Sequence, residues 1–171
     1  MLAFDIETTG LNFYKDSITC ICIYDPAIGK EKSFHFTVGD FKEKRERAEE
    51  FMRELDDADQ ICTFNGIQFD IPFVQVQFKA DPDRVAMWLL KTVDIFHKYK
   101  SLHNHTFSLD SALMCNNLKT KTSNGYEAVK MAKEGRLKEL EEYCMMDTKL
   151  TYELTMLPYF NAPEQKTWKK H

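Results

Sequence analysis

The stretch Leu2-Ala3-Phe4-Asp5-Ile6-Glu7-Thr8 has the pattern of a β-strand that ends in acidic side chains. Side chains alternate along a strand, so Asp5 and Glu7 share one face and the apolar residues share the other. Apolar side chains normally fill both faces of a central strand, so paired carboxylates break the pattern. Like charges this close disfavour each other unless a cation lies between them. The pair therefore indicates a metal site, although an edge strand with one solvent-facing side explains it better when it is taken alone.

Further apolar runs along the chain predict a mixed α/β fold. Strands are expected at residues 18–24, 33–38, 60–64 and 92–95, and the first three strands of the chain should form a meander. Helices are expected at residues 41–55, 72–78, 108–115, 126–133 and 137–157. Asp40 and Glu43 have the capping-box pattern that marks the start of the first of these helices. The prediction assigns no element to residues 79–91 or 96–107. Strands first and helices later predict one domain over residues 1–157, with a mixed sheet of about five strands flanked by α-helices, and a loosely ordered tail over residues 158–171.

Composition favours an ordinary globular protein. The 171 residues are 43% hydrophobic and 29% charged, which is enough apolar material for one core. The net charge of −4 argues against holding nucleic acid by bulk electrostatics, but it leaves room for an enzyme that binds phosphate through metal ions. No apolar run reaches the roughly 20 residues that cross a bilayer, and the N-terminus lacks a signal-peptide pattern. We therefore expect an intracellular protein, cytoplasmic or nuclear, that is neither secreted nor membrane-bound.

The five cysteines are an odd number, and each lies in a segment with the pattern of a core. Reduced thiols are therefore expected. Cys20 and Cys22 alternate along an apolar strand and should face the same side. Simple packing is favoured over a zinc site for this pair, because the sequence offers no second pair to complete a tetrahedral set.

Two further segments place polar groups where apolar ones are expected. Tyr143 and Asp147 lie four residues apart, on or beside the apolar stripe of the long C-terminal helix, so they should project toward a common point. Asp70 follows a predicted strand and an Asn65-Gly66 turn, near the sheet edge where functional groups gather. Taken alone, Asp147 is as easily solvated, Asp70 is better explained as a helix N-cap, and Asn65 as a turn residue.

Three motifs together resemble the exonuclease motifs of the DEDD superfamily, in the same order. They are Phe4-Asp5-Ile6-Glu7-Thr8-Thr9-Gly10-Leu11, Asn65-Gly66-Ile67-Gln68-Phe69-Asp70-Ile71-Pro72-Phe73 and Tyr143-Cys144-Met145-Met146-Asp147. A tyrosine before the last aspartate is similar to the tyrosine subclass (DEDDy), and the second motif most resembles the proofreading exonuclease domain of family B DNA polymerases. The resemblance covers residues 2–157 and implies an RNase H-like fold.

The resemblance implies a 3′-to-5′ exonuclease that hydrolyses phosphodiester bonds at the 3′ end of single-stranded nucleic acid and releases nucleoside 5′-monophosphates, with DNA favoured over RNA. It also implies two divalent ions, Mg²⁺ or Mn²⁺, which all-oxygen ligands favour. Asp5, Glu7 and Asp147 would hold one ion, and Asp5 would reach a second ion whose water shell contacts Asp70. Tyr143 would orient the attacking water, since a phenol with an ordinary pKa near 10 is a poor base at neutral pH.

By the same resemblance, four residues contact the substrate. Thr8 and Leu11 would contact the terminal nucleotide, with Leu11 as a wedge, while Asn65 and Phe69 would line the path of the strand. Such contacts tolerate any base. A polymerase, a helicase or another replication or repair protein is the implied partner, and the sequence leaves the oligomeric state open. Two other functions remain: a nucleic-acid-binding or scaffolding module with weak or partner-dependent nuclease activity, and an RNase H-type endonuclease, which would cut closed circles.

Overall fold

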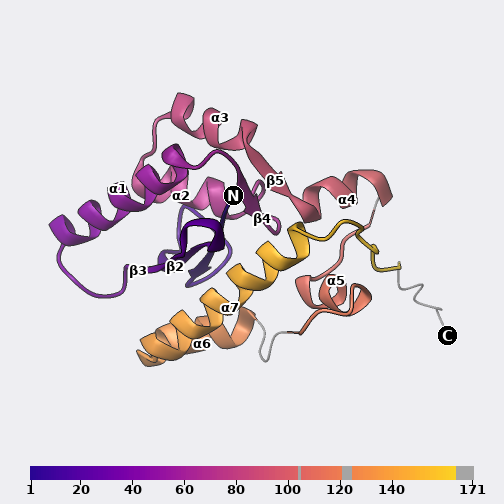
Figure 1. Cartoon of the computed structure of the whole chain (residues 1–171). Helices are drawn as coiled ribbons and strands as arrows, with labels where there is room; N and C mark the ends of the chain where they lie inside the picture. Colours follow the sequence, from indigo (N-terminus) through magenta and orange to yellow (C-terminus); the bar gives the residue numbers. More distant parts are fainter. Residues whose placement is uncertain (104, 121–124, 165–171) are drawn as a thin grey trace.

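The computed structural model describes residues 1–103, 105–120 and 125–164. Its sheet has five strands in the order β3-β2-β1-β4-β5 (Figure 1). The strands are β1 (Leu2–Thr8), β2 (Ile18–Asp25), β3 (Lys30–His35), β4 (Ile61–Thr63) and β5 (Thr92–Asp94). β1, β2 and β3 form an antiparallel meander, whereas β4 is parallel to β1 and β5 is parallel to β4. The predicted mixed sheet of about five strands is confirmed.

Helices cover both faces of this sheet (Figure 1). Those described are α1 (Phe41–Asp57), α2 (Asp70–Phe78), α3 (Pro82–Leu90), α4 (Ile95–His103), α5 (Leu109–Cys115), α6 (Gly125–Glu134) and α7 (Leu137–Thr155), with a short 3-10 helix, η1 (Pro26–Ile28). One core cluster joins α1, α2 and α3 to one face, and a second joins α6 and α7 to the other. α1 begins as predicted, because Asp40 and Glu43 form a capping box.

β1 lies in the middle of the sheet, with a neighbour on each side. Its apolar residues Leu2, Phe4 and Ile6 are buried on the side of α1, and the ring of Phe4 lies 5.5 Å from that of Phe51. The opposite side of β1, which carries Asp5 and Glu7, faces α7. The explanation of the acid pair by an edge strand is therefore wrong.

The structure corrects several element boundaries. β3 begins at Lys30 and ends at His35, earlier than the predicted 33–38, because Lys30 and Lys32 form ion pairs with glutamates of α1 and so make a polar strand favourable. α2 begins at Asp70 instead of Pro72, since a proline is tolerated in the first turn, where its missing N–H is not needed. α3 and α4 occupy segments to which the sequence assigned no element. Cys115 is exposed and not in the core, contrary to expectation.

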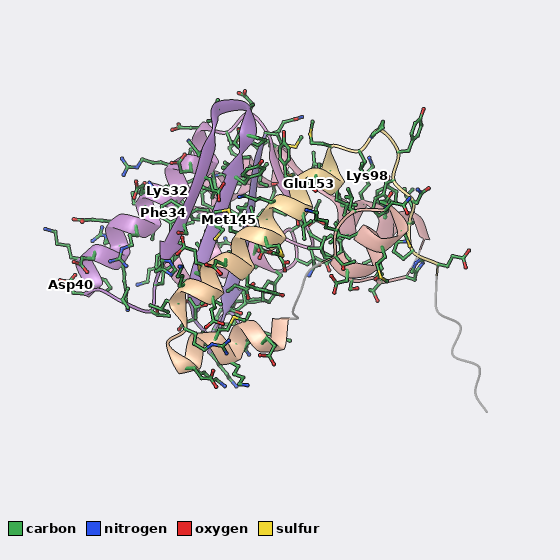
Figure 2. The ribbon with its side chains drawn as sticks, turned by 60° about the horizontal axis from the view of Figure 1, so that its bottom comes forward. Lys32, Phe34, Asp40, Lys98, Met145 and Glu153 are labelled. Atoms are coloured by element: carbon green, nitrogen blue, oxygen red, sulfur yellow. The ribbon has the colours of Figure 1, made fainter. Side chains whose placement is uncertain are left out.

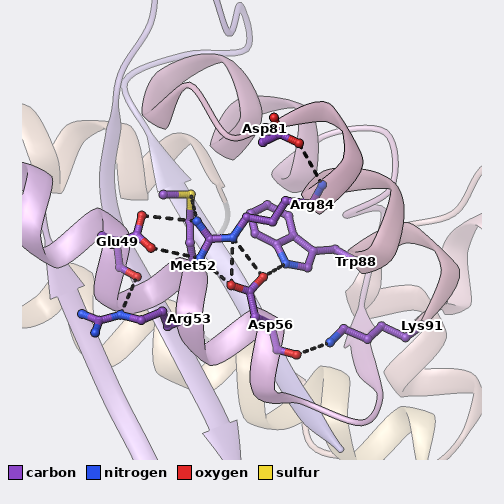
Figure 3. A network of polar contacts seen from close by, with 8 residues as sticks. All are labelled: Glu49, Met52, Arg53, Asp56, Asp81, Arg84, Trp88 and Lys91. Carbon is purple, nitrogen blue, oxygen red and sulfur yellow. Dashed lines mark hydrogen bonds and ion pairs between the residues drawn. The ribbon is translucent and has the colours of Figure 1, made fainter.

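α3 is held against α1 by a network around Arg84 (Figure 3). Its guanidinium pairs with Asp56 at 2.5 Å and with Glu49 at 3.2 Å. The buried Trp88 donates its indole N–H to the Asp56 carboxylate at 2.7 Å, and Lys91 donates to the Asp56 carbonyl at 2.7 Å. Because α3 leads directly into β5, the network also holds the start of that strand, which ends at Asp94.

The segment after α7 packs beside α4 and α5 as far as it is described. The ring of Phe160 lies 4.0 Å from that of Tyr99. Asn116 and Asn161 exchange two hydrogen bonds, each between a side-chain amide and a main-chain group. Residues 165–171 of the predicted tail lie outside the described part. Among the described residues, no helix is both long and apolar enough to cross a membrane.

Candidate active site

The two acids of β1 lie side by side beneath α7. Oxygen atoms of Asp5 and Glu7 and the sulfur of Cys144 all lie within 4.8 Å of one another. Asp5 is half-buried, and Glu7 retains only 9% of its exposure. The shared face that alternation predicted is therefore confirmed, and burial makes the two negative charges costly without a counter-charge.

α7 brings the late motif to the same face of the sheet. Figure 2 shows this helix, marked by Met145 and Glu153, crossing the strands. Tyr143 and Asp147 are each only 6% exposed, so the alternative of a solvated Asp147 is wrong. Cys144, which precedes Asp147 by three residues and therefore lies one turn away on the same side, donates to the main-chain oxygen of Asp5 at 3.4 Å. This weak hydrogen bond joins α7 to β1 next to the acidic residues.

Asp70 reaches β1 from the start of α2. Its Oδ1 accepts a hydrogen bond of 3.1 Å from the main-chain N–H of Ile6, the residue between Asp5 and Glu7. The N-cap explanation is wrong, because Phe69 occupies the N-cap position and no side chain caps it. Burial to 3% exposure raises the pKa of Asp70 to about 7, and the hydrogen bond from Ile6 only partly opposes this. A cation beside Asp70 would offset the cost of burying its charged form.

Asp94, at the end of β5, is an architectural residue that sequence reasoning missed. Its carboxylate accepts main-chain hydrogen bonds from Asn65 at 3.0 Å, Ile67 at 2.9 Å and His97 at 2.9 Å. It also accepts from the hydroxyl of Thr63 at 3.2 Å. These bonds hold the turn that delivers Asp70. An acid at the carboxyl end of a parallel strand was the available signal.

The four predicted substrate residues have different environments. Thr8 is buried and donates its hydroxyl to the Gly10 carbonyl at 2.6 Å, so its side chain shapes the loop after β1. Asn65 has a positive φ of 67°, and its buried Oδ1 has no hydrogen-bond partner within the described part of the chain. Phe69 is half-buried against the core. Leu11 is 81% exposed.

The loop that carries Leu11 is braced from within. The carboxylate of Asp16 accepts from the main-chain N–H of Asn12 at 2.9 Å. The side-chain amide of Gln77, on α2, donates to the carbonyl of Asp16 at 2.9 Å and to that of Phe13 at 3.2 Å. An exposed leucine is therefore presented by a loop tied to the same helix that carries Asp70.

The cysteines are arranged differently from the prediction. Cys20 and Cys22 do share a face, but Cys144 of α7 joins them, and the three sulfur atoms lie within 4.8 Å of one another. The prediction that no second pair lies beside Cys20 and Cys22 stands in the part that the structure describes, but a single third thiol does lie beside them. Sequence reasoning could not find the third thiol, because 122 residues separate Cys22 from Cys144.

The carboxylate groups have the chemistry of a hard-cation site. Asp5 and Glu7 offer oxygen atoms close enough to share one ion. Asp70 and Asp147 add buried carboxylates on the two elements that flank β1. Oxygen ligands of this kind suit Mg²⁺ or Mn²⁺, whereas zinc prefers nitrogen and sulfur.

Comparisons with solved structures support the fold. A family B DNA polymerase from the hyperthermophilic archaeon Pyrobaculum calidifontis matches with a TM-score of 0.70 and 18% identity, over 90% of this chain and 24% of the polymerase. A structure described as the apo form of the nuclease matches with a TM-score of 0.59 and 18% identity, over 90% of this chain and 69% of that one. The chain thus spans about a quarter of the polymerase.

A comparison with curated proteins gave no match. The family model described as RNase_H superfamily matches residues 2–157, which include β1, α2 and α7 with all the acidic residues discussed above. From its matched residues and its five-stranded mixed sheet, the chain belongs to the RNase H superfamily.

Proposed function

We propose that this protein is a metal-dependent 3′-to-5′ exonuclease of the tyrosine subclass, acting on single-stranded nucleic acid with DNA favoured over RNA. One observation carries the proposal. Asp5 and Glu7 lie together on the central strand beneath the helix of Tyr143 and Asp147, while Asp70 is bonded to the residue between them. Asp5 and Glu7 are thus close enough to share an ion, while Asp70 and Asp147 reach the neighbourhood of the same strand from α2 and α7.

The acidic residues act as ligands in this proposal. Asp5, Glu7 and Asp147 would hold one cation, and Asp5 would reach a second cation whose water shell contacts Asp70. When bound, the two divalent cations supply Lewis-acid stabilisation and a water of lowered pKa. The Ile6 N–H fixes Asp70 against β1, so that its carboxylate does not need to reorganise. Tyr143 orients the attacking water by hydrogen bonding, and a nucleoside 5′-monophosphate leaves.

The substrate strand approaches the loop after β1. Leu11 offers an exposed apolar side chain on a braced loop, which suits contact with the face of the terminal base. Thr8 supports this loop, and Phe69 and Asn65 lie by the turn that carries Asp70. The fold likeness to a DNA polymerase supports a polymerase, a helicase or another replication or repair protein as partner.

The test is digestion of matched 3′-labelled DNA and RNA oligomers, and of a closed single-stranded circle, with Mg²⁺ or Mn²⁺. Wild type is compared with Asp5→Asn and Glu7→Gln, which keep the size of each side chain. Asp59→Asn is the matched control: this exposed acid precedes β4 and so lies at the opposite edge of the sheet from the end of β1.

We expect labelled mononucleotides from the linear strands with wild type and Asp59→Asn, an intact circle, and a loss of at least roughly 100-fold in both β1 variants. Cleavage of the circle would favour an RNase H-type endonuclease. No release at any metal concentration would favour a binding or scaffolding module. Equal rates for wild type and Asp5→Asn would refute the site.

A further inference from the structure

A cluster of three thiols lies beside the acids of β1, on the same face of the sheet, and is not used by the proposed nuclease reaction. Cys20 and Cys22 of β2 and Cys144 of α7 are fully buried, and we call them the thiol cluster. The sulfur atoms of Cys20 and Cys22 are 4.0 Å apart. Zinc–sulfur bonds of about 2.3 Å place tetrahedral sulfur ligands about 3.8 Å apart. The spacing therefore fits a thiophilic ion without rearrangement of the strand.

A histidine lies beside one member of the thiol cluster, Cys20. His35 is the direct cross-strand partner of Cys20, so both side chains lie on the face covered by α7. Its Nδ1 is buried and has no partner in hydrogen-bond geometry within the described part of the chain. The neighbouring sulfur of Cys20 raises the pKa of His35 to about 9, which shows that the ring and the thiol cluster interact.

The other ring nitrogen of His35 is oriented by an acid. Nε2 lies 3.1 Å from the carboxylate of Glu141, and the Ser33 hydroxyl donates to the second oxygen of the same group. Histidines that bind a metal typically engage a carboxylate through their second nitrogen, which fixes the ring and its tautomer. His35 has this arrangement, with Nδ1 left toward the protein interior.

Plain packing is the competing explanation. Buried thiols behave as small apolar groups, and two of these have weak acceptors: Cys22 donates to the Glu141 carbonyl at 3.7 Å and Cys144 to that of Asp5 at 3.4 Å. Packing, however, leaves the buried Nδ1 of His35 with no partner in hydrogen-bond geometry and with only the sulfur of Cys20, a weak acceptor, beside it. A ligand between the sulfurs and this nitrogen would give Nδ1 a stronger partner.

We propose that Cys20, Cys22, Cys144 and Nδ1 of His35 form a structural site for one zinc ion, next to the carboxylate site but with a different set of ligands. Three sulfurs and one nitrogen are a ligand set that selects zinc over magnesium. An open groove of about 760 Å³ between β3 and α7 is lined by Ser33 among others and by Glu141, whose carboxylate faces Nε2 of His35. The ion would tie α7 to β2 and β3.

The consequence for the nuclease is positional. Cys144 lies between Tyr143 and Asp147 on α7, and its sulfur is 3.9 Å from a carboxylate oxygen of Asp5. A zinc ion bound to this sulfur would hold α7 at a defined distance from β1. It would thereby also position the Asp147 side chain, which lies one turn further along α7. The zinc site thus acts on the reaction by holding a helix.

The experiment uses the full chain, purified with a non-thiol reductant, stripped of metal and titrated with Co²⁺ and then Zn²⁺. We expect one equivalent of Co²⁺ with an intense sulfur-to-cobalt charge-transfer band and the visible bands of tetrahedral coordination, both lost on addition of one equivalent of Zn²⁺. Elemental analysis checks the stoichiometry, and circular dichroism checks that each variant is folded.

The variants separate the two metal sites. Cys144→Ser, Cys20→Ser and His35→Gln should lose the charge-transfer band or weaken zinc binding at least roughly 100-fold. The double variant Asp5→Asn/Glu7→Gln should keep the band, although it removes the carboxylate site.

Milder changes and matched controls complete the set. Glu141→Gln should weaken zinc binding by roughly 10- to 100-fold, because it perturbs only the orientation of His35. Cys62→Ser and Cys115→Ser are matched controls, since these thiols lie outside the cluster, and they should bind as wild type does.

Two results would overturn the proposal. The first is a folded wild-type protein that gives no charge-transfer band with Co²⁺. The contact between Cys20 and His35 would then be an interaction between two side chains without a metal ion. The second is cobalt binding that survives Cys144→Ser but is lost in the Asp5→Asn/Glu7→Gln variant, which would assign the ion to the carboxylates. Neither result bears on whether the protein releases mononucleotides, so the two proposals fail independently.

Discussion

Asp70→Asn should remove a pH dependence of stability that wild type shows without metal. The folded pKa is about 7, against an ordinary value of 3.8, because burial disfavours the charged form. Between these two values the folded protein holds a proton that the unfolded chain has released. The free energy of unfolding therefore falls as pH rises from about 4 to 7 and stays low above it.

The size of the effect follows from the shift. About three pKa units at 1.36 kcal/mol each give about 4 kcal/mol in total, of which about 3 kcal/mol falls between pH 5 and 8. For a urea dependence of roughly 2 kcal/mol/M, this moves the unfolding midpoint by about 1.5 M. Water penetration reduces this figure, so it is an upper value. Asparagine carries no charge and can still accept the hydrogen bond from Ile6.

The assay is urea unfolding at pH 5 and pH 8 in EDTA, followed by circular dichroism. Other titrating groups are common to both proteins, so the difference between wild type and Asp70→Asn isolates this carboxyl. Asp59→Asn controls for the loss of an exposed charge. Mg²⁺ at pH 8 should raise the stability of wild type more than that of Asp70→Asn. An equal change from pH 5 to pH 8 in the two proteins would refute the reasoning.

Three further variants test other parts of the structure. Tyr143→Phe should lower mononucleotide release roughly 100-fold while the stabilisation by Mg²⁺ in thermal unfolding stays as in wild type; a loss of both would contradict a water-orienting role. Gly10→Ala should destabilise by about 1–3 kcal/mol in urea unfolding, because an added Cβ would lie 2.5 Å from the Asp16 carboxylate, and Asp16→Ala in the same chain should restore much of that loss. Asp56→Ala should cost about 1–3 kcal/mol by the same measurement, since it leaves the Trp88 N–H without its acceptor, and an unchanged midpoint would count against the network of Figure 3.

Local sequence patterns carried much of the fold. Strand alternation placed Asp5 and Glu7 on one face, and the capping pattern at Asp40 placed the start of α1 correctly. The periodicity of the last helix put Tyr143 and Asp147 on its buried side. These features depend on neighbours within a few residues, which is why they can be read without knowing the tertiary contacts.

Contacts between distant segments could not be read in this way. The main-chain N–H of Ile6 donates a hydrogen bond to Asp70, which lies 64 positions later in the sequence. This contact shows that the Asp70 side chain reaches β1 and does not cap a helix. The thiol cluster depends on the register that sets Cys22 opposite Asp5 and on the height of α7. α3 was not predicted, although its start could have been read locally: Asp81 is its N-cap and Pro82 is its first residue.

The order of the elements along the chain has a consequence for biosynthesis. Translation delivers Asp5 and Glu7 within the first strand, whereas Asp147 arrives only in α7, after every other helix that the structure describes. A domain generally folds as one unit. A ribosome-bound chain that stops before α7 therefore carries three of the four proposed carboxylate ligands, but it lacks Asp147 and the helix that covers the acids of β1. In such an unfinished chain the proposed site is incomplete, because Tyr143 and Asp147 enter the chain only with the last helix that the structure describes.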